Sequence, residues 1–361
     1  MGKTKNAILD MVDWARAGRS VLVTGKPGSG KTAVTVNEFM AAMAEHLSVE
    51  VDAMSLTDLR PCTMDPIDYR GYPFPDPVTK TTTWLMPDFL PKTGPGVLLI
   101  EEIGNADKAH HYALYQLVEQ RKLGDYKLPD DIFIVATSND RTDGCGVKKM
   151  PSALMDRFAR VKFECDPDDW REWARNHGVD YKIIAATHFL EDILTEWDGK
   201  SGDEQSSPRS LVYFDEVIRA NGLKVGGGAD DGGTHGYSRP VYNEESLRVL
   251  RKAEAVLGET DAARVVGFMA LFENLPPIPE ILANPETVEI PDRLDVTWAL
   301  VTQIAKTVEE DDLKNALLFI DRLGLTFRAV FGVELPKLNT KMAYKTVAFT
   351  DWIARNPSLF S

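Results

Sequence analysis

The feature that most constrains this chain is a glycine-rich run that follows a short apolar segment, Gly25-Lys26-Pro27-Gly28-Ser29-Gly30-Lys31-Thr32. It matches the pattern GxxxxGK(S/T) at every fixed position, and it lies between an expected strand at residues 20–24 and an expected helix at residues 31–47. Glycines let backbone N–H groups curl round phosphate oxygens, and the N-terminus of the helix adds a favourable dipole. We therefore expect the whole run to bind the phosphates of ATP, with Lys31 at the β- and γ-phosphates and Thr32 on Mg²⁺.

Two acidic residues, Glu101 and Glu102, come directly after the apolar segment 97–100. A buried strand that ends in acids would place them at the carboxyl edge of a parallel sheet, beside the glycine-rich run. One carboxylate can assist Mg²⁺, directly or through water, and the other can orient the water that attacks the γ-phosphate. Taken alone, the same pattern also fits a strand that simply leaves the core.

A third polar candidate, Asn139, follows the apolar strand expected at residues 131–138. At the same edge of the sheet, its amide group can hydrogen-bond the γ-phosphate or the attacking water. The alternative is an asparagine that forms a turn together with Asp140, because Asn and Asp are common turn residues.

The chain alternates strands and helices as far as residue 166, which indicates a three-layer α/β unit with a largely parallel sheet. Short apolar runs predict its strands, at residues 20–24, 49–56, 96–100, 131–138 and 161–165. From Pro167 onward the pattern is helical. The expected domains are an α/β nucleotide-binding domain at 1–166, a helical lid at 167–221, a flexible glycine-rich loop at 222–242 and a helical C-terminal region at 243–361.

The charge balance limits the partners of the chain. With 41 basic and 55 acidic residues the formal net charge is −14, which argues against generic binding to nucleic acid but is compatible with a local basic groove. The chain has three widely spaced cysteines, which predict a protein of a reducing compartment. Their spacing favours neither a disulfide framework nor a zinc site. The longest apolar run, Val265–Phe272, is shorter than the roughly 18 residues of a membrane span. We expect a cytoplasmic protein that does not enter a membrane.

Several weaker motifs follow one another in a fixed order, and together they resemble the AAA+ ATPases, in particular the MoxR branch. The likeness covers about residues 5–221. Residues 70–73 and 84–91 look like the family's insertion in helix 2, and residues 120–129 look like its hairpin before sensor 1. Two further segments look like its arginine-finger and sensor-2 signatures, Leu154-Met155-Asp156-Arg157-Phe158 and Ser207-Pro208-Arg209-Ser210.

The resemblance assigns roles to four residues: Glu102 as the catalytic carboxylate, Asn139 as sensor 1, Arg157 as the arginine finger and Arg209 as sensor 2. A finger supplied by a neighbouring subunit would neutralise charge that develops on the transferred phosphoryl group. Arg209 would lie on the lid of the same chain and tie the lid to the nucleotide state. Either arginine could instead form a surface or capping ion pair, and Arg160 is the substitute for Arg157 in that case.

By the same resemblance, the chain would hydrolyse ATP with Mg²⁺ between the subunits of a hexameric ring, and it would remodel or activate another protein. Relatives often act with a partner that carries a von Willebrand factor A domain, so a partner of that kind is expected. Thr32 and Glu101 are the expected Mg²⁺ ligands. Two departures from the family stand out: Glu101 replaces its usual Asp, and residues 102–106 read Glu-Ile-Gly-Asn-Ala where it usually has Glu-Ile-Asn-Arg-Ala.

One of these departures keeps a second function open. The longer side chain of Glu101 changes its reach towards Mg²⁺, which leaves room for a slow, ATP-gated assembly switch. A nucleic-acid motor is less favoured, because the chain is acidic and shows no helix-turn-helix or zinc module.

Four aromatic residues of the expected insertion could grip a client protein in a ring pore, or they could pack beneath the insertion: Tyr69, Tyr72, Phe74 and Trp84.

Overall fold

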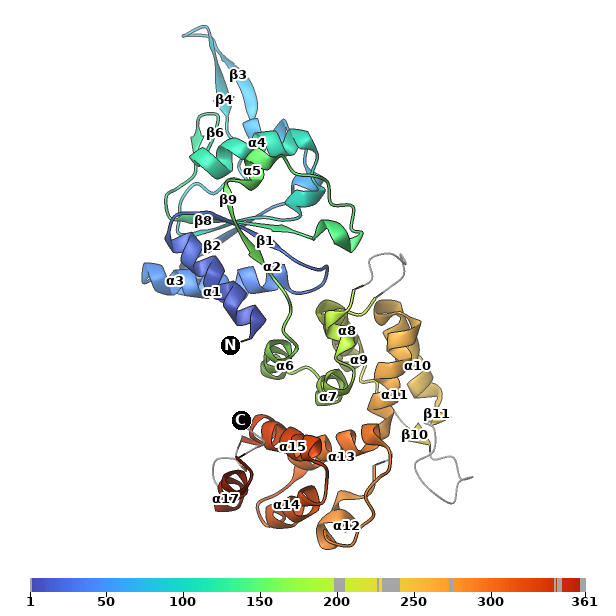
Figure 1. Ribbon diagram of the computed structural model, residues 1–361. Helices are drawn as coiled ribbons and strands as arrows, with labels where there is room; N and C mark the ends of the chain where they lie inside the picture. The colour runs from blue at the N-terminus through green and yellow to red at the C-terminus, as the bar shows by residue number, and fades with distance from the viewer. Residues whose placement is uncertain are drawn as a thin grey trace. The chain divides into compact units, whose positions relative to one another are not determined.

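The computed structural model describes residues 2–197, 205–225, 227–228, 241–272, 275–340, 342 and 346–357 (Figure 1). The chain forms two compact units. The first comprises Met1–Glu172, Leu194–Asp203 and Ser207–Arg209, and the second comprises Trp173–Ile193, Glu204–Ser206 and Ser210–Ser361.

The first unit is built on a five-stranded sheet in which every neighbouring pair is parallel. In spatial order the strands are β2 (Ser55–Leu59), β5 (Gly96–Ile100), β8 (Ile132–Ser138), β1 (Ser20–Thr24) and β9 (Phe158–Lys162). Because all five run the same way, their carboxyl ends meet at one edge, where the glycine-rich run, the acids and Asn139 follow their strands.

Helices cover both faces of this sheet. They are α1 (Lys3–Arg16), α2 (Lys31–Val34), a π-helical segment (Thr35–Phe39), α3 (Met40–Leu47), α4 (Lys108–Gln120) and α5 (Ser152–Met155). The start of α6 (Pro167–Asn176) also belongs to the first unit. Short 3₁₀ turns occur at Val51–Ala53, Pro61–Thr63, Asp68–Arg70, Ile103–Asn105 and Arg141–Asp143. The three-layer α/β fold class predicted from the sequence is therefore confirmed.

Strand β5 shows how the layers are held together. Its residues alternate between the two faces, so that Val97 and Leu99 pack with α1 and the helix after the glycine-rich run, whereas Leu98 and Ile100 pack with α4. A strand buried on both faces needs apolar residues throughout, which is why this central strand was predicted to the residue.

Two strands differ from their predicted positions. The strand predicted at residues 49–56 forms at Ser55–Leu59, because Val51–Ala53 makes a 3₁₀ turn and the strand itself lies at the edge of the sheet with polar, largely exposed residues. The strand predicted at residues 161–165 begins three residues earlier, at Phe158, and ends at Lys162. In both cases the apolar run and the hydrogen-bonded run overlap only in part.

Two antiparallel hairpins extend from the first unit, and the longer one projects away from the sheet (Figure 1). The longer hairpin pairs β3 (Tyr72–Asp76) with β4 (Thr81–Leu85), and the shorter one pairs β6 (Lys122–Leu123) with β7 (Tyr126–Lys127). The four aromatic residues of the expected insertion differ in their exposure to solvent. Tyr69 is fully buried in the core that includes α4, whereas Tyr72 is 76% exposed, and Phe74 and Trp84 are also exposed.

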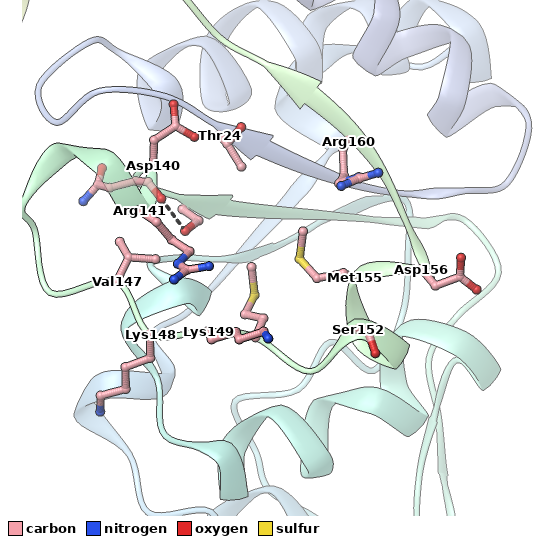
Figure 2. A pocket seen from close by; sticks show the side chains of 13 residues that line it. Thr24, Asp140, Arg141, Val147, Lys148, Lys149, Ser152, Met155, Asp156 and Arg160 are labelled. Atoms are coloured by element: carbon pink, nitrogen blue, oxygen red, sulfur yellow. Dashed lines mark hydrogen bonds between the residues drawn. The ribbon is translucent and has the colours of Figure 1, made fainter.

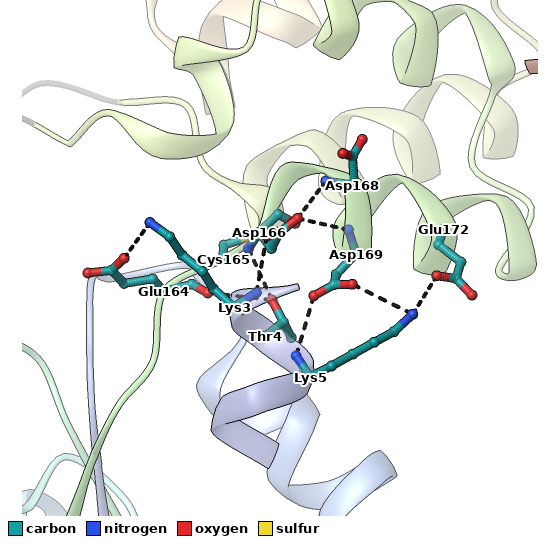
Figure 3. A network of polar contacts seen from close by, with 9 residues as sticks. All are labelled: Lys3, Thr4, Lys5, Glu164, Cys165, Asp166, Asp168, Asp169 and Glu172. Atoms are coloured by element: carbon teal, nitrogen blue, oxygen red, sulfur yellow. Dashed lines mark hydrogen bonds and ion pairs between the residues drawn. The ribbon is translucent and has the colours of Figure 1, made fainter. Parts of the chain in front are cut away.

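The N-terminal end of α1 is tied to the segment that leads into α6 (Figure 3). The backbone N–H of Lys3 donates to the Asp166 carboxylate at 3.1 Å, and that of Lys5 donates to the Asp169 carboxylate at 3.3 Å. The Lys3 ammonium pairs with Glu164 at 2.9 Å. Acceptors on one segment thus satisfy N–H groups that the first turn of α1 leaves without a partner inside the helix.

The second unit is mainly helical. Its helices, some of which begin or end in the first unit, are α7 (Tyr181–Phe189), α8 (Asp192–Thr195), α9 (Pro208–Ala220), α10 (Glu244–Leu257), α11 (Glu259–Leu271), α12 (Ile278–Ala283), α13 (Leu294–Thr307), α14 (Leu313–Asp321), α15 (Leu325–Leu338) and α17 (Val347–Arg355). One short strand pair joins β10 (Gly227–Gly228) to β11 (Val241–Tyr242). A core rich in aromatic side chains, including Phe331, Phe349 and Trp352, holds the last helices together.

The expected domain boundaries relate to these units as follows. The lid expected at residues 167–221 contributes residues to both units, and the region expected at 243–361 lies in the second. Of the expected flexible loop at 222–242, residues 226 and 229–240 lie outside the described residues. Within the described part of the chain, no helix combines the length and the apolar character that crossing a membrane requires.

Candidate nucleotide-binding site

The glycine-rich run leaves strand β1 and turns sharply into α2. Two of its glycines have left-handed backbones, Gly28 at φ 66° and Gly30 at φ 102°, which other residues adopt only with strain. A Cβ atom on Gly28 would also lie 2.5 Å from the Ser207 hydroxyl oxygen. Both the conformation and the close approach of a second segment therefore require glycine at position 28.

Lys31 lies at the centre of the loop with 9% of its surface exposed. Its ammonium group donates to the carbonyl oxygens of Gly25 at 2.8 Å and Lys26 at 2.7 Å, and to the Asn139 side-chain oxygen at 3.0 Å. Burial, and after it the positive charge of Arg209, lower the pKa of Lys31 to about 8. The structure thus joins the lysine of the run to the polar residue that follows β8.

Thr32 and Glu101 meet at the same edge of the sheet. The threonine hydroxyl donates to one carboxylate oxygen of Glu101 at 2.5 Å, and the Arg60 guanidinium pairs with the other oxygen at 2.7 Å. Glu101 is buried, and Arg60 reaches it from the end of the neighbouring strand, β2. The sequence reasoning missed Arg60, because it placed β2 too early in the chain to show that this arginine ends a strand.

Glu102 differs from Glu101 in both exposure and backbone. Its side chain is exposed, and its backbone is left-handed, with φ 54° and ψ 35°. Its N–H group donates to the Thr137 hydroxyl on β8 at 3.3 Å. Such a conformation costs on the order of 1 kcal/mol in a residue other than glycine, and strain of this kind gathers at functional sites. The strained turn directs Glu102 out of the core directly after its buried neighbour.

The residues of this edge fit a nucleotide with Mg²⁺. Ser29 carries a buried hydroxyl oxygen that has no hydrogen-bond partner among the described residues, so it is a donor available to a phosphate oxygen. The first turn of the following helix presents N–H groups that lack acceptors within the helix. Thr32 and Glu101 place two oxygen ligands side by side, which is the donor chemistry that Mg²⁺ prefers.

Arg209 belongs to the segment 207–209, which is part of the first unit. Its backbone N–H donates to the Gly28 carbonyl at 3.1 Å, and its side chain is exposed. Since its charge also lowers the pKa of Lys31, Arg209 lies within electrostatic reach of the loop. The sensor-2 candidate is therefore beside the phosphate-binding run.

Arg157 is engaged elsewhere in its own chain. Its guanidinium pairs with the Glu119 carboxylate at 3.0 Å and lies 3.9 Å from the centre of the Tyr115 ring. This is the surface ion pair that the sequence left open as the alternative role. Arg160, on β9, is exposed and has no ion pair with any described residue. The structure thus brings together Lys31, Thr32, Glu101 and Asn139, with Glu102 and Arg209 alongside, and leaves Arg157 in a separate contact.

Comparison with known proteins gives similarities of structure alone. No protein-family model and no curated protein matches the chain. Among solved structures, NtrX from Brucella abortus in complex with ADP shares 12% identity and a TM-score of 0.38, over 99% of this chain and 68% of that one. In another NtrX structure, with 14% identity and a TM-score of 0.38, the match takes in 70% of this chain and 59% of that chain, so this chain spans about three fifths of that protein's length.

Two further structures are similar at the same level. A putative ATPase from Cytophaga hutchinsonii shares 14% identity and a TM-score of 0.34, over 100% of this chain and 91% of that one. The Thermotoga maritima RuvB Holliday junction branch migration motor shares 13% identity and a TM-score of 0.32, over 98% and 86% of the two chains. Similarity at this level does not decide an activity, so any functional assignment rests on the residues of the site.

Proposed function

We propose that this chain is an ATPase of the AAA+ class that binds ATP with Mg²⁺ at the carboxyl edge of its sheet. The observation that carries the proposal is the convergence of the buried Lys31 ammonium, the paired Thr32 and Glu101 oxygens and the Asn139 amide on one loop. A buried ammonium that has only neutral acceptors within hydrogen-bond distance is suited to receive the negative charge of phosphate groups.

Different residues of the site have different roles in ATP hydrolysis. Lys31 and the N–H groups of the run hold the phosphates, and Asn139 orients Lys31. Mg²⁺, held by Thr32 and Glu101, supplies charge neutralisation at the phosphates. Glu102 is the exposed carboxylate on a strained turn next to Glu101, so it is the group that orients the attacking water.

Measurements of ATP turnover and of ATP affinity, made on the same variants, test these roles in hydrolysis. We expect the wild-type chain to release phosphate from ATP only when Mg²⁺ is present, and Glu102→Gln to keep ATP affinity while losing on the order of 10²-fold or more of turnover. Glu45→Gln, an exposed acid on α3, is the matched control and should leave both unchanged. Undiminished turnover in Glu102→Gln would remove the catalytic role from that residue.

On the strength of the sequence resemblance, we further propose that the chain works as a MoxR-like ring. In this proposal ATP is hydrolysed between subunits of a hexamer, with Arg157 or, in its place, Arg160 acting on the neighbouring nucleotide, and the energy remodels or activates a partner protein such as one with a von Willebrand factor A domain. The exposed aromatics of the β3–β4 hairpin, Tyr72 and Phe74, support a role in contacting a client.

Light scattering with and without ATP tests the ring, since Glu102→Gln should assemble with ATP and stay assembled. The same variant should retain its partner in a pull-down, whereas Tyr72→Ser with Phe74→Ser should assemble normally and lose that partner. A chain that remains monomeric at every ATP concentration would contradict the ring.

A second candidate function, a slow ATP-gated assembly switch, is favoured by one observation. Arg60 neutralises Glu101 through the ion pair at 2.7 Å, at the position where the metal ligand is proposed. If this chain is a switch, turnover stays negligible while ATP still drives assembly. Glu101→Asp, which restores the residue usual in the family, should then raise turnover, and no change would count against the switch.

A further inference from the structure

A separate cavity of about 620 Å³ opens in the first unit, beside the ends of β1 and β8 (Figure 2). Its wall is formed by residues that follow β8, by the segment that leads into α5 and by β9. It shares Asn139 with the nucleotide site, but no residue of the run 25–32 lines it. The cavity is therefore a neighbour of the phosphate-binding loop and not part of it.

The lining of this cavity is basic, although the chain as a whole is acidic. Four basic and two acidic residues line it, in a chain with a net charge of −14. Among the four, Lys148 is paired with Asp107 at 2.6 Å and points away from the cavity (Figure 2). Arg141, Lys149 and Arg160 form no ion pair with any described residue.

These three cations come from three places in the fold, namely the 3₁₀ turn after β8, the segment before α5 and strand β9. In Figure 2 the head groups of Arg141 and Lys149 point into the space that the cavity occupies. One of the two lining acids is engaged by the backbone, because the Asp140 carboxylate caps the turn Arg141–Asp143 and accepts a backbone N–H. With three cations that lack an ion pair among the described residues, the interior is suited to an anionic group.

The cavity also has an apolar part. Val147, Met150 and Met155 line it together with the cations. Its volume lies within the range of about 300–1,000 Å³ that small-molecule sites occupy, and such sites combine apolar walls with a few polar groups that fix orientation. Methionine adapts its shape to different apolar groups. Inorganic phosphate alone would leave this apolar wall unused.

We propose that this cavity binds a small organic phosphate ester, with Arg141 and Lys149 on the phosphate group and the methionines on the organic part. The proposal goes beyond the nucleotide site and does not depend on ATP hydrolysis. Asn139 lines the cavity, and its side-chain oxygen also accepts a hydrogen bond from Lys31 at 3.0 Å. A ligand in the cavity would therefore contact a residue that is hydrogen-bonded to the nucleotide loop. The ligand should therefore change the affinity for ATP, and ATP should change the affinity for the ligand by the same factor.

Calorimetric titration with phenyl phosphate tests the binding site, because this probe carries both a dianion and an apolar ring. We expect phenyl phosphate to bind more tightly than inorganic phosphate and much more tightly than phenol. The double variant Arg141→Ala with Lys149→Ala should weaken it by about tenfold or more, as expected for lost charge-assisted hydrogen bonds. Lys148→Ala, which removes a lysine engaged by Asp107, is the matched control and should leave the affinity unchanged.

Two further measurements make the result decisive. Lys31→Ala, which disables the phosphate-binding loop, should still bind phenyl phosphate; if binding is lost there and kept in the double variant, the probe occupies the loop and the proposal is overturned.

ATP affinity measured with and without saturating phenyl phosphate should differ in the wild type and not in the double variant. Equal ATP affinities in the wild type would overturn the coupling. Self-association that disappears in the double variant, without any phenyl phosphate binding, would assign the cavity to an acidic segment of a second copy instead.

Discussion

Each of the two units buries a charged side chain, and the two are held in opposite ways. Lys31 in the first unit is 9% exposed, and its ammonium donates to two carbonyl oxygens and one amide oxygen, all of them neutral. Glu334 on α15 of the second unit is 2% exposed and faces three basic groups, His188 at 3.2 Å, Lys337 at 3.5 Å and Arg175 at 3.6 Å.

The pKa values follow from these surroundings. Burial and the like charge of Arg209 lower the pKa of Lys31 to about 8, so its environment disfavours the charged form. Burial alone would raise the pKa of Glu334, but the hydrogen bond and charge of His188, with Lys337 and Arg175, lower it to about 2. Asp143 and Asp140 attract Lys31 only from beyond hydrogen-bond distance and do not offset its burial, so its ammonium is suited to pair with a negative charge from outside, whereas the Glu334 carboxylate is already paired within its unit.

The largest effect that tests this contrast is expected for Lys31→Ala. The variant should lose about 100-fold or more in ATP affinity, because charge-assisted hydrogen bonds to phosphate are lost. Its resistance to urea should change little, since the removed ammonium was desolvated without a carboxylate within hydrogen-bond distance. A fluorescent ATP analogue and urea unfolding measure the two quantities, and a large loss of stability with intact binding would reverse the roles given to the two residues.

Glu334→Gln should show the reverse pattern. The shift of its pKa from the ordinary 4.5 to about 2 corresponds to about 3 kcal/mol of stability at pH 7. Because the pKa is lower in the folded state, this stability is fully present above pH 4.5 and is lost as the pH falls towards 2. The wild type and the variant should therefore converge in acid.

Hydrogen exchange measured on α15 and on β8 locates the effect of Glu334→Gln in the second unit, where faster exchange is expected only in α15. Glu310→Gln, an exposed acid of the same unit, is the control and should be neutral. ATP affinity should be unchanged in both variants. A stability difference that persists at pH 2 would show that the carboxylate charge is not the cause.

The sequence predicted the first unit well because its signals are local. The glycine-rich run and the apolar strand Gly96–Ile100 each carry their pattern within a few residues, and the structure places Lys31 next to Asn139. The edge strand β2 was misplaced because it is polar and exposed, so no apolar period marks it. Arg60 was missed for the same reason.

No local pattern in the sequence reveals the Glu334 cluster. Glu334 and Lys337 on α15 lie more than a hundred residues along the chain from Arg175 on α6 and His188 on α7, so only tertiary packing brings the two pairs together. The three cations of the cavity show the same limit, since nothing in a single segment reveals that Arg141, Lys149 and Arg160 share one space. Charge clusters built from distant segments are properties of the fold.

A smaller effect is expected where the first unit does compensate a charge, at Glu101. Arg60→Ala removes the ion pair at 2.7 Å and leaves the carboxylate free for Mg²⁺. Because Arg60 is largely exposed, the pair is worth at most about 1 kcal/mol, so the Mg²⁺ concentration for half-maximal turnover should fall only about two- to fivefold. Arg16→Ala, on the exposed side of α1, is the control. A rise in the required Mg²⁺ would mean that Arg60 helps to orient Glu101 and does not compete for it.

The smallest effect is expected at Arg157, whose contacts with Glu119 and the Tyr115 ring are partly exposed. Arg157→Ala and Glu119→Gln break the same ion pair, so both should lower the melting temperature slightly, and Arg157→Ala should lower it more because it also loses the contact with the Tyr115 ring. Turnover separates the two variants, because only Arg157 is a candidate to act on the nucleotide of a neighbouring subunit. If Arg157→Ala loses turnover and Glu119→Gln does not, Arg157 leaves its ion pair to work as the finger. If both stay active while Arg160→Ala does not, the ion pair is the whole role of Arg157, and the finger is Arg160, which the first unit leaves without a counter-charge among the described residues.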